Sequence, residues 1–235
     1  SNTGIAYLIY GSASLSNINL TNLGSQGITI SYASTCFSCQ IGCSASYAGD
    51  VNGDGKDDFL IGACSYSFGI GIAYLIYGST NLTNIDLANL GSRGIVISYT
   101  GTCSNCNIGS SVATAGDVNG DGYADIVIGA PYANSNYGAS YIIFGKLNNF
   151  SNIYLANLTS AEGFSMLGTY MSYSGSSVSG VGDTDKDGYD DIIIGGRSGV
   201  SFVIFGKIGN FSNINCSILT SNQGFSISGA TTSWY

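Results

Sequence analysis

The stretch AGDVNGDGYADIVIGA (residues 115–130) occurs in three versions in this chain of 235 residues. AGDVNGDGKDDFLIGA (48–63) and VGDTDKDGYDDIIIGG (181–196) match it, so that the first aspartate stands at 50, 117 and 183. Two further landmarks recur at similar spacing: an apolar segment such as IAYLIYG (72–78) and a glycine-led segment such as GIVISY (94–99). Self-similarity at a fixed period predicts a repeat architecture.

Each landmark has the composition of a β-strand. Ile, Val, Tyr and Phe dominate the short apolar runs, Gly closes them, and no helical period is sustained. One repeat is therefore expected to contain strands at 110–116, 125–130, 139–145 and around 163–167. Four antiparallel strands per repeat are typical of a β-propeller blade.

We predict an all-β chain of about 3.5 propeller blades. Residues 1–40 supply only the third and fourth strands of a blade, and full repeats follow at 41–107, 108–173 and 174–235. Because a closed ring takes about 4–8 blades, we expect the array to be part of a larger propeller or to be completed by neighbouring chains.

The acidic residues are concentrated in the turns between the first and second strands. Twelve of the fourteen lie within 50–58, 117–125 and 183–191. These turns read D-x-N-x-D-G-x-x-D twice and D-x-D-x-D-G-x-x-D once, a pattern that offers Ca²⁺ hard oxygen ligands at positions 1, 3, 5 and 9 and a main-chain carbonyl at position 7. The expected ligands are Asp50, Asn52, Asp54, Lys56 (carbonyl) and Asp58; Asp117, Asn119, Asp121, Tyr123 (carbonyl) and Asp125; and Asp183, Asp185, Asp187, Tyr189 (carbonyl) and Asp191.

Three other interpretations fit these turns less well than a calcium loop between strands. An EF-hand needs a glutamate at position 12 and flanking helices, whereas Ile61, Ile128 and Ile194 stand there within strands. Magnesium keeps its waters rather than accept five protein oxygens. An Asx-type turn without metal is disfavoured by three loops in register. We therefore expect three structural Ca²⁺ ions, which would reduce the formal charge from −8 to −2.

Cysteines and sequons indicate an oxidising, glycosylating route, and hence secretion or cell-surface display. The six glycosylation candidates are Asn19, Asn81, Asn149, Asn157, Asn210 and Asn215.

The cysteine spacing favours disulfides over zinc. The pairs Cys36/Cys39 and Cys103/Cys106 are 67 residues apart, which is wider than zinc ribbons allow, so local or cross-blade disulfides are expected. Cys43 and Cys64 form another candidate pair. Cys216 is then left over, as a buried thiol or as one half of an intermolecular disulfide.

Several function classes are disfavoured by what the chain lacks. It contains no histidine, which removes Ser-His, Cys-His and His-metal catalysis. Glu162 and Asp86 lie outside the aspartate turns and have no evident carboxylate partner for glycosidase chemistry. There is no basic stripe for nucleic acid, and no apolar run of the length that a membrane helix needs.

These motifs resemble FG-GAP repeats, the blades of the integrin-α propeller and of many secreted bacterial and protist proteins. The FG element stands at Phe144-Gly145 and Phe205-Gly206, and in tyrosine form at Tyr10-Gly11 and Tyr77-Gly78. The GAP element is intact at Gly129-Ala130-Pro131 and departs to Gly62-Ala63-Cys64 and Gly195-Gly196-Arg197. The long third-to-fourth-strand connections look closer to microbial or protist members.

The resemblance implies a non-enzymatic calcium-binding module for cell adhesion or protein recognition, with calcium loops on one face and binding loops on the other. One alternative is a structural subunit of an extracellular filament or coat, whose partners are identical neighbouring chains. Another is a calcium-dependent lectin. Asn134–Tyr137 lies in a connection where propellers bind ligands. The tyrosines either form a sugar- or protein-binding surface or fill gaps between blades: Tyr99, Tyr132, Tyr137, Tyr170 and Tyr173.

Overall fold

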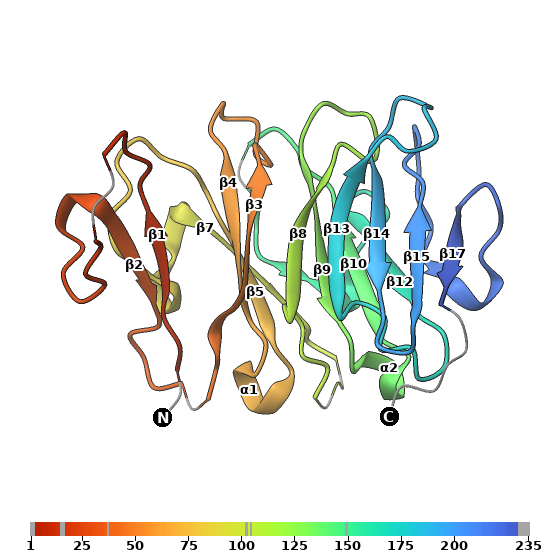
Figure 1. Cartoon of the computed structure of the whole chain (residues 1–235), viewed down its shortest axis with the longest axis horizontal. Helices are drawn as coiled ribbons and strands as arrows, with labels where there is room; N and C mark the ends of the chain where they lie inside the picture. The colour runs from red at the N-terminus through yellow and green to blue at the C-terminus, as the bar shows by residue number, and fades with distance from the viewer. Residues whose placement is uncertain are drawn as a thin grey trace.

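The computed structural model describes residues 3–14, 17–36, 38–101, 103, 105–148 and 150–229. Four β-sheets stand side by side in chain order, with their strands running between two faces of the molecule (Figure 1). The turns at 50–58, 117–125 and 183–191 lie along one edge of the view, and we call this side the aspartate face. The opposite side carries the single helical turns α1 (Tyr66–Gly69) and α2 (Ala133–Asn136), and we call it the connection face.

The predicted all-β propeller fold is confirmed, because each full sheet contains four consecutive antiparallel strands. The partial first sheet contains only two strands of its own repeat. In chain order, the strands are β1 (Ala6–Ile9) and β2 (Gly27–Ser31); β3 (Ile41–Gly49), β4 (Asp58–Ala63), β5 (Ile72–Ile76) and β7 (Gly94–Ser98); β8 (Ser111–Gly116), β9 (Asp125–Ala130), β10 (Ala139–Ile143) and β12 (Gly163–Leu167); and β13 (Ser177–Gly182), β14 (Asp191–Gly195), β15 (Val200–Ile204) and β17 (Gly224–Ser228).

The hydrophobic core lies between sheets. Successive side chains of a strand point to opposite faces, so Leu60 of β4 packs toward the third sheet while Ile61 packs toward the first. In a sheet that lies between two other sheets, a central strand such as β4 is therefore buried on both faces. This explains its unbroken apolar sequence. On the last sheet, Ile192 and Ile194 are buried against the third sheet, whereas Ile193 is only partly covered.

A short strand within each third-to-fourth-strand connection crosses to the preceding sheet. β6 (Ile85–Asp86) pairs in parallel with β2, β11 (Ile153–Tyr154) with β7, and β16 (Ile214–Asn215) with β12. The sequence interpretation treated these connections as loops. We call them latch segments: Asn84–Leu87, Asn152–Leu155 and Asn213–Cys216. The last residue of each segment begins a turn of 3-10 helix: η2 (Leu87–Asn89), η4 (Leu155–Asn157) and η5 (Cys216–Ile218).

The asparagine that opens each latch segment adds a hydrogen bond to the parallel strand pairing. The side-chain oxygens of Asn84, Asn152 and Asn213 accept from backbone N–H groups of β2, β7 and β12, the outer strands of the preceding sheets, at 2.9, 3.0 and 2.9 Å. The apolar residues that follow are buried between the two sheets. Each blade is thus fastened to the outer edge of its predecessor.

Ile153→Ala is expected to lower the free energy of unfolding by about 2 kcal/mol, since it empties a buried position between the second and third sheets. Ile18→Ala is the matched control. Ile18 is the equivalent residue of the first sheet but is only half-buried, so its loss should cost less than half as much. Urea unfolding with calcium present compares them, and equal losses would contradict the role of the latch.

Candidate metal centres

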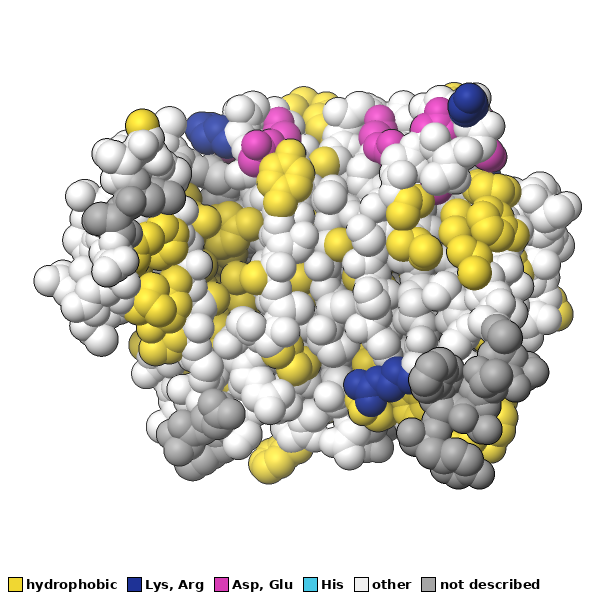
Figure 2. Space-filling view, viewed as in Figure 1, with side chains coloured by type: hydrophobic (Ala, Val, Ile, Leu, Met, Phe, Trp, Pro, Cys, Tyr) yellow, Lys and Arg dark blue, Asp and Glu magenta, His cyan; other side chains and the backbone are white. Residues whose placement is uncertain are grey.

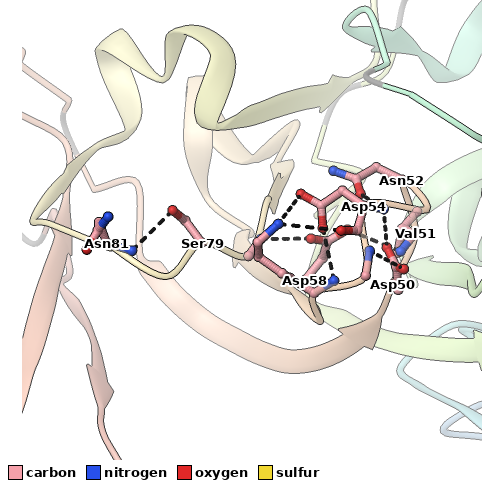
Figure 3. A network of polar contacts seen from close by, with 10 residues as sticks. Asp50, Val51, Asn52, Asp54, Asp58, Ser79 and Asn81 are labelled. Atoms are coloured by element: carbon pink, nitrogen blue, oxygen red, sulfur yellow. Dashed lines mark hydrogen bonds and ion pairs between the residues drawn. The ribbon is translucent and has the colours of Figure 1, made fainter.

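The three aspartate loops share one pattern of hydrogen bonds, shown for the first loop in Figure 3. Asp50 accepts from the backbone N–H of Asp54 through Oδ1 at 3.0 Å and from that of Gly55 through Oδ2 at 2.8 Å. Asn52 Oδ1 also accepts from Asp54 N–H, at 3.0 Å. The second and third loops repeat these contacts. The backbone thereby holds the side-chain oxygens of positions 1 and 3 on the inside of each turn.

The third loop brings three carboxylates together. Ligand atoms of Asp183, Asp185 and Asp187 lie within 4.8 Å of one another. The pKa of Asp185 is raised, first by partial desolvation and then by the neighbouring carboxylates, of which that of Asp187 contributes most. Gathered anionic oxygens of this kind repel one another unless a cation lies between them. The donor set is entirely hard oxygen and fits a Ca²⁺ ion. The first two loops carry an asparagine at the position of Asp185, so they gather less charge.

The aspartates at position 9 are buried and bind backbone donors. Asp125 is fully buried; its Oδ2 accepts from Val118 N–H at 2.9 Å and its Oδ1 from Gly145 N–H at 2.7 Å. Asp58 and Asp191 make the equivalent pairs of bonds. Each of these carboxylates therefore joins the loop to the end of the third strand. Sequence reasoning assigned these residues only to the metal and missed their structural partners.

The glycine of the FG element is explained by the same contact. Gly145 must bring its N–H close to Asp125, and a Cβ at this position would lie 2.5 Å from the carbonyl oxygen of Ala124. Gly78 and Gly206 meet equivalent carbonyl oxygens. A side chain at any of them would push the third strand away from the buried carboxylate.

Burial without a counter-ion changes the acidity of these groups. Desolvation raises the pKa of Asp125 to about 8 and that of Asp58 to about 6, although backbone donors partly offset the effect. A bound divalent cation would supply the missing positive charge and favour the ionised carboxylates. The buried aspartates are therefore positioned to couple folding to metal binding.

Calcium-stripped protein is expected to lose stability as the pH rises from about 4 to about 8. In this window the folded chain keeps a proton on Asp125, whereas the unfolded chain has already released it near the ordinary aspartate pKa of 3.8. The unfolded state therefore binds fewer protons. With calcium present the trend should reverse, since protons compete with the ion. Thermal midpoints across this range, with and without calcium, provide the measurement. Parallel pH profiles would count against coupling between these carboxylates and the metal.

Neighbouring loops are bonded to each other. Ala124 N–H donates to the carbonyl oxygen of Asp50 at 3.3 Å, and Asp190 N–H donates to that of Asp117 at 3.2 Å. The Asp190 carboxylate also accepts from Asp117 N–H at 2.8 Å. The first ligand residue of one loop is thus held by the following blade. Acidic side chains gather along this face in Figure 2.

The connection face is aromatic and carries little charge. The Arg197 guanidinium donates to Tyr132 Oη at 2.6 Å and lies 5.1 Å from the centre of that ring. Tyr132 and Tyr173 meet edge to face, as do Tyr137 and Tyr170. Tyr170 is 71% exposed, whereas Tyr99 and the other three tyrosines of the predicted group are half-buried. Exposure therefore makes Tyr170 available for contact, and the role of these tyrosines stays a prediction.

The predicted ligand-binding connection projects from this face. Asn134 and Ser135 are exposed and adopt left-handed φ values of 52° and 56°. The equivalent Ser67 and Phe68 have φ values of 51° and 58°, and Phe68 is 96% exposed. Consecutive non-glycine residues in this region are strained. Two neighbouring blades therefore present side chains to solvent from strained turns.

The cysteines form local bridges in the described part of the chain. The disulfides join Cys36 to Cys39, Cys43 to Cys64, and Cys103 to Cys106. Cys216 is free and buried, and burial raises its thiol pKa to about 12. A buried, protonated thiol is inert, which favours the buried-thiol interpretation over an intermolecular disulfide.

The sequon asparagines remain candidates for glycosylation. Those at 19, 81, 157, 210 and 215 are all exposed, so a glycan would meet no steric barrier at the side chain itself. Asn149 lies outside the described residues.

The chain is similar to FG-GAP repeats and to integrin α chains. Residues 44–75 and 108–143 match the FG-GAP repeat family. Integrin alpha pat-2 of Caenorhabditis elegans is 32% identical over 183 residues, which cover 70% of this chain and 14% of that protein. Integrin alpha-6 of Gallus gallus is 34% identical over 157 residues (63% and 13%), and integrin alpha-8 of Mus musculus is 33% identical over 165 residues (64% and 14%).

The matches therefore span only about one seventh of the length of these curated relatives. No helix among the described residues is long and apolar enough to cross a membrane.

Proposed function

Since this chain is an integrin-α-like FG-GAP repeat protein, we propose that it is a non-enzymatic, calcium-binding module for cell adhesion or protein recognition outside the cell. Its partner would be a protein of another surface or of the extracellular matrix. The observation that carries the proposal is the separation of two faces: one is rich in aspartate, and the other carries a group of aromatic side chains of which Phe68 and Tyr170 are largely exposed.

The aspartate face is suited to a structural role. Its loops are bonded to each other across blades, and their buried aspartates bond to the ends of the third strands. A ligand bound there would have to displace contacts that hold the blades together. Three structural ions, one per loop, are therefore proposed to stiffen this face rather than to serve as the recognition site.

The connection face is suited to recognition. Phe68 and Tyr170 are largely exposed, and aromatic side chains offer large contact areas at low entropic cost. The strained turns at Ser67–Phe68 and Asn134–Ser135 support a functional use, because strain persists where a site requires it. Protein recognition is therefore proposed for these turns and the tyrosines beside them.

The test is an adhesion assay with beads that carry the biotinylated chain, applied to cultured cells in calcium-containing buffer. Phe68→Ser and Tyr170→Ser should reduce cell attachment, and EGTA should abolish it. Tyr154→Ser is the control, because this tyrosine is also exposed (48%) but lies on β11, away from the connection face. Attachment that none of the connection-face variants changes would overturn the assignment of that face. Binding to a glycan array instead of to cell-surface protein would point to a lectin.

A further inference from the structure

The GAP element of the third full repeat ends in an arginine, where the other full repeats have a proline or a cysteine. Arg197 stands at the position of Pro131 and Cys64. Pro131 and Cys64 are buried, whereas Arg197 is exposed on the connection face. The repeat itself does not need a charge at this position, so the arginine requires an explanation of its own.

The backbone of Arg197 is anchored to the preceding connection. Its N–H donates to the carbonyl oxygen of Ser172 at 2.8 Å, and Ser172 is fully buried. Gly196 permits this approach, because a Cβ at Gly196 would clash with the same oxygen. Ala63 and Ala130 stand at the equivalent positions of the other full repeats. The glycine and the arginine of the altered element therefore act together.

Two tyrosines hold the side chain of Arg197. Its Nη1 donates to Tyr132 Oη at 2.6 Å, and its guanidinium carbon lies 5.1 Å from the centre of the Tyr132 ring and 5.9 Å from that of Tyr173. The two rings meet edge to face, with their centres 5.5 Å apart. Because a cation within about 6 Å of an aromatic ring is attracted to it, the two tyrosines keep the guanidinium in one place.

The charge of Arg197 has no ion-pair partner among the described residues. The ion pair within that part of the chain joins Lys56 to Asp54, and the side chain of Arg197 makes a hydrogen bond only to Tyr132. Among the described side chains visible in Figure 2, the acidic ones gather along the aspartate face. The described part of the connection face therefore presents a fixed cation without a counter-ion of its own.

Arg197 and Tyr132 offer a ligand two kinds of hydrogen-bond donor. A guanidinium has five N–H groups, and the bond to Tyr132 Oη occupies one of them. Since that oxygen accepts the bond, the tyrosine keeps its own O–H for another acceptor. The planar fork of an arginine matches the geometry of a carboxylate, and a neighbouring hydroxyl can reach the second carboxylate oxygen.

The surroundings of Arg197 favour an isolated carboxylate over a polyanion. Tyr170 and Met171 belong to the same connection as Tyr173, and they are 71% and 46% exposed. Sulfated glycans repeat their charges and bind to clusters of basic residues, whereas Arg197 has aromatic and apolar neighbours. The formal charge of −8 also repels a highly charged anion. An acidic residue flanked by apolar residues of a protein matches this surface.

The site lies at the boundary between the third and fourth sheets. In the turn after the second strand, the first half bonds to the connection that enters its own blade, as Ser65 N–H does to Cys39 O. The second half bonds to the connection that enters the next blade, as Gly69 O does to Asn107 N–H. Arg197 belongs to the first half, so contacts with a further blade would fall on the other half of the turn.

We propose that Arg197 and the hydroxyl of Tyr132 bind a single carboxylate, that of an aspartate or glutamate in a partner protein. The guanidinium donates to one carboxylate oxygen and the Tyr132 O–H to the other. Tyr170 and Met171 contact the apolar residues beside the acidic one. The proposal rests on the recognition role of the connection face and adds the chemistry of its partner.

The test is an NMR titration of the full chain with acetyl-Phe-Asp-Phe-amide and its neutral match, acetyl-Phe-Asn-Phe-amide. The chain contains two arginines, so the Nε–H signals of Arg93 and Arg197 can be followed separately. The aspartate peptide should shift the signal of Arg197 and leave that of Arg93 in place. It should bind about 10-fold more tightly than the asparagine peptide, because the latter lacks the charge-assisted hydrogen bond.

Variants separate binding from packing, and the backbone amide signals of residues 168–176 report on all of them. Arg197→Gln and Tyr132→Phe should each weaken binding of the aspartate peptide by about 5-fold or more. Lys146→Gln is the matched control. Lys146 also lies over an aromatic ring, that of Phe150, but its N–H donates to Val51 O in the first aspartate loop. This variant should bind the peptide like the wild-type chain, and circular dichroism checks that all variants fold.

The proposal is overturned if the signal of Arg197 does not move, if both arginine signals move alike, or if the asparagine peptide binds equally well. It is equally overturned if a heparin tetrasaccharide binds more tightly than the aspartate peptide, which would indicate a sulfated glycan.

The bead assay distinguishes this proposal from the recognition function on which it rests. Arg197→Gln should reduce attachment to cells, and Lys146→Gln should not. Attachment that Arg197→Gln leaves unchanged would remove the role of Arg197 alone. Wild-type beads that fail to attach would remove the recognition function, while the carboxylate site would still stand on the peptide titration.

Discussion

Removal of calcium with EGTA is expected to lower the thermal midpoint of this chain by roughly 20 °C. Each ion that binds only the folded state at about 100 times its dissociation constant contributes about 2.7 kcal/mol. Three such ions contribute about 8 kcal/mol, and for a chain of this size 1 kcal/mol corresponds to roughly 2–4 °C. Differential scanning calorimetry in calcium and in EGTA measures the difference directly.

The size of this effect follows from where the loops lie. Each joins the first and second strands of a blade, and its backbone is bonded to the next loop, as Asp117 is to Asp190. Without the ion, the carboxylates of Asp183, Asp185 and Asp187 repel one another at close range. Loss of one ion should therefore loosen two blades rather than one turn.

Two controls separate loop chemistry from general charge effects. Glu162→Gln removes a charge outside the loops and should leave the response to EGTA unchanged. Asp183→Asn should reduce the number of bound calcium ions by one in isothermal titration calorimetry. A thermal midpoint that is the same in calcium and EGTA would remove the structural role proposed for the metal.

Asp125→Ala is expected to lower the free energy of unfolding by about 4 kcal/mol even in EGTA. Its carboxylate is fully buried and accepts from Val118 N–H and Gly145 N–H. Alanine leaves two buried donors unpaired, at a cost of about 1–3 kcal/mol each, together with a small cavity. Chemical unfolding of the calcium-free protein measures the loss without any contribution from the ion.

Asp125→Asn distinguishes the structural from the metal-binding role of this residue. The raised pKa of Asp125, about 8, means that its side chain is largely protonated at pH 7 without calcium. Asparagine keeps one acceptor oxygen but turns its NH₂ group toward the other buried N–H, so it should cost about 2 kcal/mol in EGTA, less than alanine, and should fail to gain full stability from calcium. Asp121→Ala is the control, since this exposed residue should matter only when calcium is present. Equal losses for Asp121→Ala and Asp125→Ala in EGTA would refute the buried role.

Much of the fold could be predicted from the sequence because its signals are local and repeated. The strands predicted at 125–130 and around 163–167 coincide with β9 and β12, and the strand predicted at 139–145 ends two residues earlier as β10. Short β-branched and aromatic runs closed by glycine have few other structures available to them. The aspartate turns stand out for the same reason, since one spacing of oxygen side chains recurs three times.

Part of the candidate site could not be predicted, because it consists of contacts between residues far apart in the sequence. The pairing of Asp125 with Gly145 N–H joins residues 20 positions apart, and that of Asn152 with Val96 N–H joins residues 56 apart. A backbone N–H is present at almost every residue, so composition does not mark which one a side chain will reach. The recurrence of Asn-Ile before the fourth strand was visible as a pattern, but its partner strand was not.

By itself, the sequence determined the class of this protein: a repeat protein of propeller blades with three oxygen-rich loops. Only the tertiary structure decided how the blades are joined and which carboxylates are buried. The physical reason is the range of the interactions. Strand propensity and turn chemistry act between residues that are close in the sequence. The latch at Ile153 and the hydrogen bonds of buried Asp125 form only once whole strands and sheets have packed together.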